Sequence, residues 1–229
     1  MSKPLPDTGM AVDFLSRMFG DDSVHLVSLL DGTPPQAATF SSTERGKMRK
    51  WLDAAQGVRN VYFHVNRLKA GVKDRKASKS DVSSAKALHV DIDRSDALEA
   101  IKGFAPRPTV VVWTGGGAQA FWLLQEETSN LEDVEARNAG LAEQLGGDNC
   151  QNIDRLMRVP GTINVLSPKK RAKGREPALA YLVPELTDWT RRFEIESFVK
   201  APPPPTTQAG KSLREIPAHV ELDDLPGDV

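Results

Sequence analysis

The sequence predicts an α+β fold, a mixed α/β arrangement with antiparallel as well as parallel strand pairs. Strand-like and helix-like segments follow one another without strict βαβ alternation. Two strand-like runs, residues 109–113 and 118–124, are separated only by a glycine-rich turn, as in a hairpin or a close strand pair. The 229 residues, of which 39% are hydrophobic and 27% charged, are long enough to bury a sizeable core.

Each expected element is based on the spacing of its apolar residues. Helices are expected where these residues recur every three or four positions, and strands where apolar runs are short or alternate with polar residues. In chain order the expected elements are a helix at 10–19, strands at 24–30 and 60–65 around a helix at 43–57, a strand at 86–94, a helix at 95–102, strands at 109–113 and 118–124, a helix at 131–145, a strand at 178–183 and a helix at 186–198.

The strand at 86–94 (KALHVDIDR) carries the clearest candidate site. Side chains alternate faces along a strand, so Asp91 and Asp93 share one face with His89. Two neighbouring carboxylates repel each other unless a cation lies between them, and Mg²⁺ or Mn²⁺ prefers oxygen ligands. A pair of divalent ions explains this pattern, and so does a solvated strand edge near a basic loop.

Two further segments carry polar residues in unusual settings. Residues 113–122 (WTGGGAQAFW) place three glycines between strands, where free backbone amides can cradle phosphate oxygens, although a flexible hairpin turn has the same composition. In residues 146–165, Asp154 precedes Arg155 and Arg158, which suits a metal ion beside a triphosphate. A helix with internal salt bridges is the other interpretation, and Asp148 competes with Asp154 as the third carboxylate.

Charge and cysteine content narrow the function classes. The net charge is −1, but basic residues gather in two stretches, 67–79 and 169–175, which indicates a local anionic partner or simply solvated loops. The single cysteine, Cys150, excludes an intramolecular disulfide and a cysteine-rich zinc module. The start of the chain lacks the apolar run of a signal peptide and no stretch approaches a membrane span, so we expect a cytoplasmic protein without a membrane partner.

Three motifs in this order resemble the archaeo-eukaryotic primase superfamily, and most closely the primase-polymerases of phages, plasmids and other mobile elements, the RepB-like primase catalytic domain. The motifs are HVDID at 89–93, WTGGGAQAFW at 113–122 and DRLMRVPGTIN at 154–164. The likeness covers about 60–200. It implies a catalytic core of two packed modules, one of them RNA-recognition-motif-like, spanning 1–200, with a Pro-rich linker and an acidic, disordered tail at 201–229.

The resemblance also implies a function and a set of site residues. The function is template-directed nucleotidyl transfer from nucleoside triphosphates, as a DNA primase or primase-polymerase, in the replication of a phage or plasmid in a bacterial host. Two Mg²⁺ or Mn²⁺ ions would be held by Asp91, Asp93 and Asp154, with His89 behind them, and no zinc is expected. Single-stranded DNA template, primer and nucleoside triphosphates would be the partners, with a helicase or C-terminal helical domain as a further one. The nucleotide-binding residues would be Thr114, Gly115, Gly116, Gly117, Gln119, Arg155, Arg158 and Asn164, and the nucleic-acid-binding residues Lys73, Arg75, Lys76, Lys79, Lys169, Lys170 and Arg171.

One position departs from the superfamily pattern. Many members place a histidine in the glycine-turn motif to contact the phosphates, and Gln119 stands there in this chain. Glutamine donates a hydrogen bond but carries no charge, which leaves phosphate neutralisation to the arginines or to Lys169 and its neighbours.

Two alternatives remain open from the sequence. The first is a two-metal nuclease or a replication initiator that nicks DNA, although a nicking enzyme needs a His cluster and a nucleophilic Tyr, and the chain offers only Tyr62 and Tyr181. The second is a non-catalytic, RNA-recognition-like nucleic-acid-binding module, although the strand aromatics Phe121 and Trp122 are more typical of a core.

Overall fold

The structure is a computed structural model that describes residues 4–172, 174 and 176–202. Its helices are α1 (Thr8–Phe19), α2 (Arg45–Ala55), α3 (Ala97–Gly103), α4 (Leu131–Leu145) and α5 (Pro168–Ala172). Its strands are β1 (Val24–Leu29), β2 (Gln36–Phe40), β3 (Asn60–His64), β4 (Arg67–Leu68), β5 (Val82–Ile92), β6 (Val110–Trp113), β7 (Ala118–Thr128), β8 (Leu156–Arg158), β9 (Ile163–Asn164), β10 (Ala178–Leu179) and β11 (Tyr181–Leu182).

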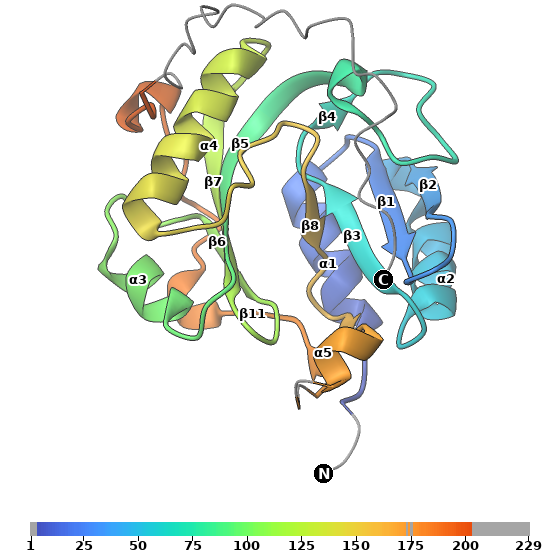
Figure 1. The fold of residues 1–229 in the computed structure, drawn as a ribbon. Helices are drawn as coiled ribbons and strands as arrows, with labels where there is room; N and C mark the ends of the chain where they lie inside the picture. The colour runs from blue at the N-terminus through green and yellow to red at the C-terminus, as the bar shows by residue number, and fades with distance from the viewer. Residues whose placement is uncertain (1–3, 173, 175, 203–229) are drawn as a thin grey trace, which may run out of the picture.

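The strands form two main sheets that lie side by side, with α1 behind and between them (Figure 1). The first sheet has the strand order β2-β1-β3-β8 and the second has the order β11-β6-β7-β5-β4; a short β9–β10 pair lies apart from both. Neighbouring strands within each sheet are antiparallel. The mixed α/β fold class predicted from the sequence is therefore confirmed, whereas an RNA-recognition-like module stays a prediction.

Helix α1 joins the two sheets through aromatic packing. Its Phe14 is fully buried, with ring centroids 5.3 Å from Phe63 of β3 and 6.5 Å from Phe121 of β7. A second core lies on the other face of β5 and β7, where Leu88 and Trp122 pack under α3 and α4. Because the second sheet is covered on both faces, its central strands form a firmly packed wall on one side of the opening between the sheets.

The two strands that the glycine-rich turn connects are a hairpin, as the sequence predicts. Val112 of β6 is opposite Gln119 of β7, and Gln119 is in turn opposite Asp91 of β5. This register places Asp91 and Gln119 side by side at the end of the sheet where β5 finishes.

Three expectations about elements are wrong or incomplete. Residues 186–198 are not a helix: short 3₁₀ turns at Pro184–Leu186 and Ile195–Ser197 flank an extended stretch. In this stretch the Phe193 amide donates to the Leu123 carbonyl, and the Gln125 amide donates to the Phe193 carbonyl, so backbone hydrogen bonds to β7 replace those of a helix. The expected elements also did not include β2, β4, β8, β9 or α5. The expected strand at 178–183 is two short strands, β10 and β11, with different partners.

The end of the chain is only partly described. Residues 198–201 cross α4, because the Arg137 guanidinium donates to the Phe198 carbonyl and the Ala201 amide donates to the Ala136 carbonyl. Of the predicted tail at 201–229, all but Ala201 and Pro202 lies outside the described residues. The helices of the described part include none long and apolar enough to cross a membrane.

Candidate active site

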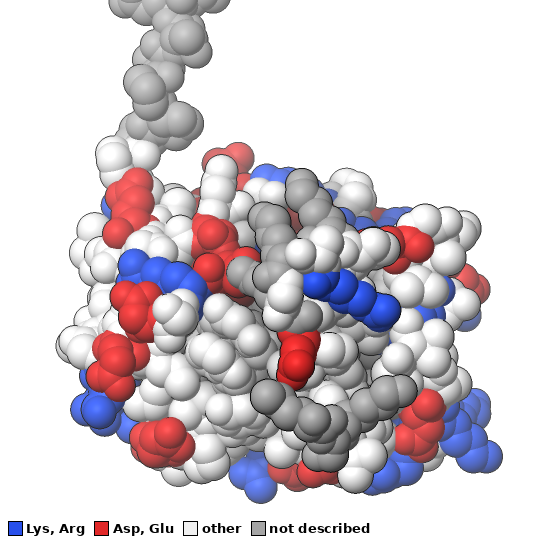
Figure 2. Space-filling view, turned by 60° about the horizontal axis from the view of Figure 1, so that its bottom comes forward, with Lys and Arg blue, Asp and Glu red and all other residues white. Residues whose placement is uncertain are grey.

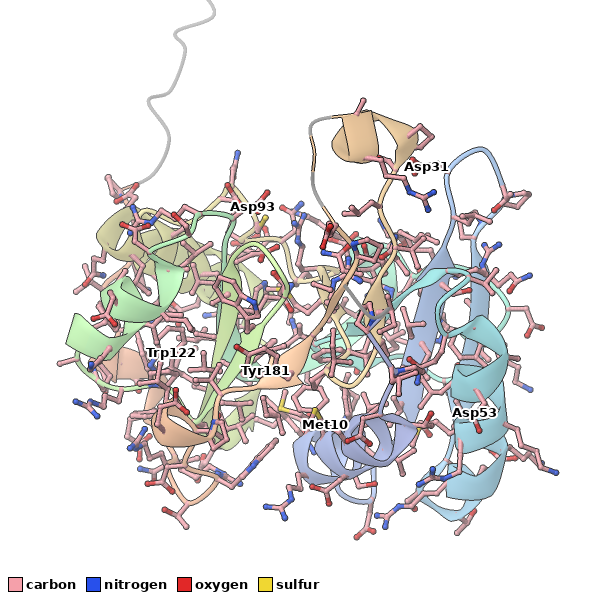
Figure 3. The ribbon with its side chains drawn as sticks, turned by 90° about the horizontal axis from the view of Figure 1, so that it is seen from below. Met10, Asp31, Asp53, Asp93, Trp122 and Tyr181 are labelled. Atoms are coloured by element: carbon pink, nitrogen blue, oxygen red, sulfur yellow. The ribbon has the colours of Figure 1, made fainter. Side chains whose placement is uncertain are left out.

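A cavity of about 720 Å³ opens between the two sheets. The second sheet contributes Asp91 and Gln119, the loop after β5 contributes Asp93, and the first sheet contributes Tyr62 and Arg158. The remaining lining residues are Thr114, Gly115, Gly116, Asp148, Arg155, Leu156, Asn164, Leu166, Glu176, Pro177 and Ala178. Figure 3 shows Asp93 on the same side of the molecule as α5, with Met10 of α1 and Asp53 of α2 on the opposite side.

Asp91 is the most constrained carboxylate of this cavity. Burial raises its pKa, and the charge of Asp148 acts in the same direction. The Arg155 guanidinium, with Nη2 3.5 Å from Asp91 Oδ2, and a hydrogen bond from Gln119 oppose this rise without cancelling it. Four carboxylates and two guanidiniums line the cavity, so its described lining carries more negative than positive charge, which favours binding of a further cation.

The structure brings Asp148, rather than Asp154, to the cavity with Asp91 and Asp93. The Asp148 amide donates to the Asp91 carbonyl at 2.8 Å, and the Asp148 side chain lines the cavity. Asp154 instead lines a neighbouring cavity of about 290 Å³, which shares Tyr62, Arg155 and Leu156 with the first. Of the two candidates for the third carboxylate, Asp148 is therefore the one that shares a cavity with Asp91 and Asp93, and the role of either in metal binding stays a prediction.

These carboxylates match the donors that Mg²⁺ or Mn²⁺ prefers, since all are hard oxygens and the buried one lacks full charge compensation. Within the described part of the chain, no group of three His, Cys, Asp or Glu side chains is close enough to enclose a metal ion. The donor set fits divalent cations in chemistry, and its side chains would have to draw together to hold them.

Arg158 lies almost fully buried in the wall of the cavity. Its guanidinium donates to Asn60 Oδ1 at 2.9 Å, to the Tyr62 hydroxyl at 3.0 Å and to Asn164 Oδ1 at 3.1 Å, and it stacks over the Tyr62 ring at 4.9 Å. All these partners are neutral, and no described carboxylate forms an ion pair with it. Burial lowers its pKa, and the Tyr62 hydroxyl and the nearby Asp91 charge act against that fall, so the arginine stays charged beside the cavity without a direct ion-pair partner among the described residues.

The glycine turn is held against the short β9–β10 pair. Asn164 Nδ2 donates to the Thr114 carbonyl at 2.9 Å. Gly115 has a φ of +94°, and a Cβ there would lie 2.6 Å from the Ala178 Cβ. A Cβ on Gly117 would lie 2.0 Å from the Ile92 carbonyl oxygen, so only glycine permits the turn to approach the end of β5.

His89 lies behind the cavity and does not line it. The side chain is 1% exposed, and both ring nitrogens have partners, the Cys150 carbonyl at 3.1 Å and the Asn138 amide nitrogen at 3.4 Å. Burial lowers its pKa to about 4, which keeps the imidazole neutral. This position fits the supporting role expected for His89 and not a role as metal ligand.

The basic residues predicted to bind nucleic acid fall into distinct settings. Arg75 makes two hydrogen bonds to Asp81, and Lys79 pairs with Glu135 of α4. Lys76 lines the cavity of Asp154, while Lys73 lines a third cavity together with His25 of β1 and Thr39 of β2. Arg171 is exposed on α5, and the side chains of Lys169 and Lys170 lie outside the described ones.

Figure 2 shows acidic and basic side chains interspersed on the face that carries α5, among the side chains described there. The described part of this face therefore has no single continuous basic patch. Attraction of a nucleic acid to it would depend on individual lysines and arginines rather than on one broad field.

Two residues of this region were not predicted from the sequence: Tyr62, which lines the cavity, and Asn60, which holds Arg158 from behind it. In residues 60–65 (NVYFHV), polar-tipped side chains alternate with Val61, Phe63 and Val65, all of which pack in the core with α1. That alternation was the available signal, because it places Asn60 and Tyr62 together on the face away from the core.

Comparisons with known proteins found a matching family model and solved structures of similar fold. A family model described as the RepB DNA-primase N-terminal domain matches residues 32–209. The AEP domain of the primase-polymerase of cyanophage S-2L superposes with a TM-score of 0.58 at 17% identity, covering 85% of this chain and 97% of that one. The primase RepB′ gives a TM-score of 0.57 at 16% identity, covering 81% of this chain and 58% of that one. The catalytic domain of RepB′ in complex with initiator DNA gives 0.55 at 18% identity, covering 76% and 83%. No curated protein sequence matches the chain.

Proposed function

Because this chain belongs to the family of RepB DNA-primase N-terminal domains, we propose that its cavity carries out template-directed nucleotidyl transfer, making primers for the replication of a mobile element. The likeness of fold to a phage primase-polymerase domain supports the proposal. Within this family assignment, the particular reaction follows from the residues that meet in the cavity.

The observation that carries the proposal is the meeting of four carboxylates and two guanidiniums around one opening. The cavity is lined by Asp91, Asp93, Asp148 and Glu176 together with Arg155 and Arg158. Carboxylates of this kind hold divalent cations, and guanidiniums bind phosphates through paired N–H donors. A metal-bound nucleoside triphosphate presents both complementary groups in one molecule.

Two Mg²⁺ or Mn²⁺ ions, when bound, lower the pKa of the attacking hydroxyl and offset the charge of the leaving pyrophosphate. Asp91 and Asp93 would hold these ions, with Asp148 as the third carboxylate. Arg155, 3.5 Å from Asp91 in this structure, would turn to the phosphates once a cation offsets the Asp91 charge. The protein supplies position and charge, and no side chain becomes covalently attached to the substrate.

Arg158 would give the triphosphate a fixed positive charge. The bonds to Asn60, Tyr62 and Asn164 commit three of the five N–H donors of a guanidinium and hold the group rigid. Its remaining donors would reach an anion without first breaking an ion pair. The amides of the turn at Thr114–Gly117 would add uncharged donors for the same phosphates.

A single-stranded DNA template and a primer would lie across the opening of the cavity. The structure of the RepB′ catalytic domain with initiator DNA, a relative in fold, supports a nucleic-acid partner. Lys76 and Arg155, which line the neighbouring cavity, would offer positive charge to such a strand.

The test is incubation of the protein with Mn²⁺, labelled nucleoside triphosphates and a single-stranded DNA template, with ribonucleotides and deoxyribonucleotides supplied separately. Oligomers whose composition follows the template support the proposal. Shortening of the template would indicate a two-metal nuclease or a nicking initiator instead. A shift of the template in a gel with neither product would indicate a binding module without catalysis.

A further inference from the structure

The segment 147–153 lies along the outer edge of β5, where that strand has no neighbouring strand. β4 pairs only with the start of β5, at Val82 and Ser84. Farther along, the Asp148 amide bonds to the Asp91 carbonyl, and a Cβ on Gly147 would lie 2.5 Å from Val90 Cγ2. The segment is therefore pressed against the strand that carries Asp91, although it is not itself a strand.

Asn138 of α4 connects this segment to β5. The side chain is 1% exposed, and its Oδ1 accepts from the His89 amide at 2.9 Å. Its Nδ2 faces the Gln151 carbonyl at 3.2 Å and His89 Nδ1 at 3.4 Å. The buried amide group of Asn138 thus accepts from the backbone of β5 with its oxygen and donates to the backbone of the segment with its nitrogen.

His89 makes the next link. Since His89 Nδ1 faces the N–H group of Asn138, the ring proton lies on Nε2, which donates to the Cys150 carbonyl at 3.1 Å. Two consecutive carbonyls of the segment, those of Cys150 and Gln151, are therefore held by two side chains that also bond to each other. Both contacts lie within three residues of Asp148.

The far end of the segment is fixed independently. The Ile153 amide donates to Glu135 Oε1 at 3.0 Å, and the Ile153 carbonyl accepts from Asn66 Nδ2 at 2.9 Å. At the near end, the Gly147 amide donates to the Ala142 carbonyl and the Asp148 amide donates to the Asp91 carbonyl, both at 2.8 Å. Between these two ends, the bonds of Asn138 and His89 restrain the stretch that follows Asp148.

We propose that Asn138 and His89 are positioning residues, which hold Asp148 beside Asp91 so that both carboxylates face the same divalent cation. The inference rests on the proposed function, because it concerns the metal ion that this function requires. Neither residue touches the cavity, so each would act only through the segment that carries Asp148. Supporting hydrogen bonds of this kind typically change metal affinity by about 10- to 100-fold.

The variant Asn138→Asp isolates the positioning role. Its carboxylate still accepts from the His89 amide, so the edge of β5 stays satisfied. It has no N–H group for Gln151 and places negative charge against that carbonyl oxygen. Gln144→Ala is the matched control, since Gln144 is on the same helix and bonds only within it, to the Gly140 carbonyl.

The experiment is a double-mutant cycle read by Mn²⁺ binding, with free Mn²⁺ measured by electron paramagnetic resonance in the absence of nucleotide. Wild type, Asn138→Asp, Asp148→Asn and the double variant are compared. We expect Asn138→Asp to weaken Mn²⁺ binding by about 10-fold or more. We expect the double variant to be no weaker than Asp148→Asn alone, because residues that act through one another are not additive. Gln144→Ala should bind as wild type does.

Unchanged Mn²⁺ affinity in Asn138→Asp, or losses that add in the double variant, would overturn the inference and leave the proposed function intact. A wild type that binds no Mn²⁺ would overturn the proposed function as well. If Asn138→Asp fails to unfold cooperatively, the same cycle is run with His89→Phe, which keeps the ring and removes the donor to Cys150.

Discussion

Gln119 accepts a hydrogen bond from the backbone amide of Arg158 at 3.0 Å, although the two residues belong to different sheets. Gln119 lies directly opposite Asp91 and also hydrogen-bonds to its carboxylate. One buried side chain therefore connects the strand of the buried carboxylate to the strand of the buried guanidinium. The superfamily pattern places a charged contact to phosphate at this position, whereas here the residue first joins the two halves of the site.

We expect Gln119→Leu to destabilise the fold by about 1–3 kcal/mol, because the substitution leaves the buried Arg158 amide without an acceptor. Urea unfolding monitored by tryptophan fluorescence measures the change. Gln125→Leu, at an exposed position on the same strand, is the control and should change stability little. Equal stability of the two variants would show that the bond between the sheets contributes nothing.

Asp91→Asn and Asp93→Asn should each abolish template-directed synthesis while leaving single-strand binding near the wild-type level. Loss of a metal ligand removes several kcal/mol of charge stabilisation from the transition state. Primer-synthesis gels with Mn²⁺ and fluorescence anisotropy on an oligonucleotide provide the two measurements. Glu99→Gln on α3, an exposed carboxylate outside the cavity, is the matched control. Synthesis by either aspartate variant at the rate of Glu99→Gln would contradict the metal site.

The third carboxylate gives a comparison in which sequence and structure lead to opposite expectations. The order of residues around Arg155 favours Asp154, but Asp148 shares the cavity with Asp91 and Asp93. We therefore expect Asp148→Asn to lose synthesis far more severely than Asp154→Asn under the same gel conditions. A dead Asp154→Asn beside an active Asp148→Asn would restore the expectation from the sequence.

The raised pKa of Asp91 predicts that this carboxylate lowers the stability of the metal-free protein at neutral pH. A carboxyl whose pKa is higher in the folded than in the unfolded chain lowers stability as the pH rises through that interval, and the loss persists at neutral pH. In EDTA at pH 7, Asp91→Asn should therefore melt at a higher temperature than wild type. The difference should shrink as the pH falls toward the ordinary carboxyl pKa of 3.8.

Addition of Mg²⁺ should reverse this order of melting temperatures. An ion that binds only the folded chain stabilises it by mass action, and only the wild type keeps the full donor set. Asp96→Asn, an exposed neighbour beyond the strand, is the control and should show neither effect. A wild type that melts above Asp91→Asn in EDTA would mean that Arg155 and Gln119 outweigh the cost of burial.

Local patterns in the sequence predicted the features that depend on the backbone geometry of a few neighbouring residues. Alternation along residues 86–94 predicts Asp91 and Asp93 on one face, and both line one cavity, although β5 ends at Ile92 and Asp93 lies in the loop that follows. The glycine-rich turn likewise predicted the β6–β7 hairpin. Both features depend on strand geometry over a few residues, so they need no knowledge of distant contacts.

Features set by distant contacts were not accessible in the same way. The position of Asp148 depends on Asn138 of α4 and on the edge of β5, and the spacing of residues 146–165 does not report either. The expected helix at 186–198 failed because Phe193 pairs with β7, a bond between segments about seventy residues apart that outweighs local helical preference. Strand β8 was missed since its three residues acquire a strand conformation only by pairing with β3.

The last prediction separates the lysines free to bind phosphate from those already paired. Lys73 and Lys76 form no ion pair with any described residue, whereas Lys79 pairs with Glu135. Each phosphate neutralised on a single strand contributes about 0.7 to the slope of log affinity against log salt. Lys73→Gln with Lys76→Gln should therefore flatten that slope by about 1 to 1.5, with little sequence preference. Lys79→Gln should change it less, because Glu135 already offsets the Lys79 charge. Fluorescence anisotropy on a single-stranded oligonucleotide across a salt series gives all three slopes, and an equal slope in wild type and double variant would place the nucleic acid away from this loop.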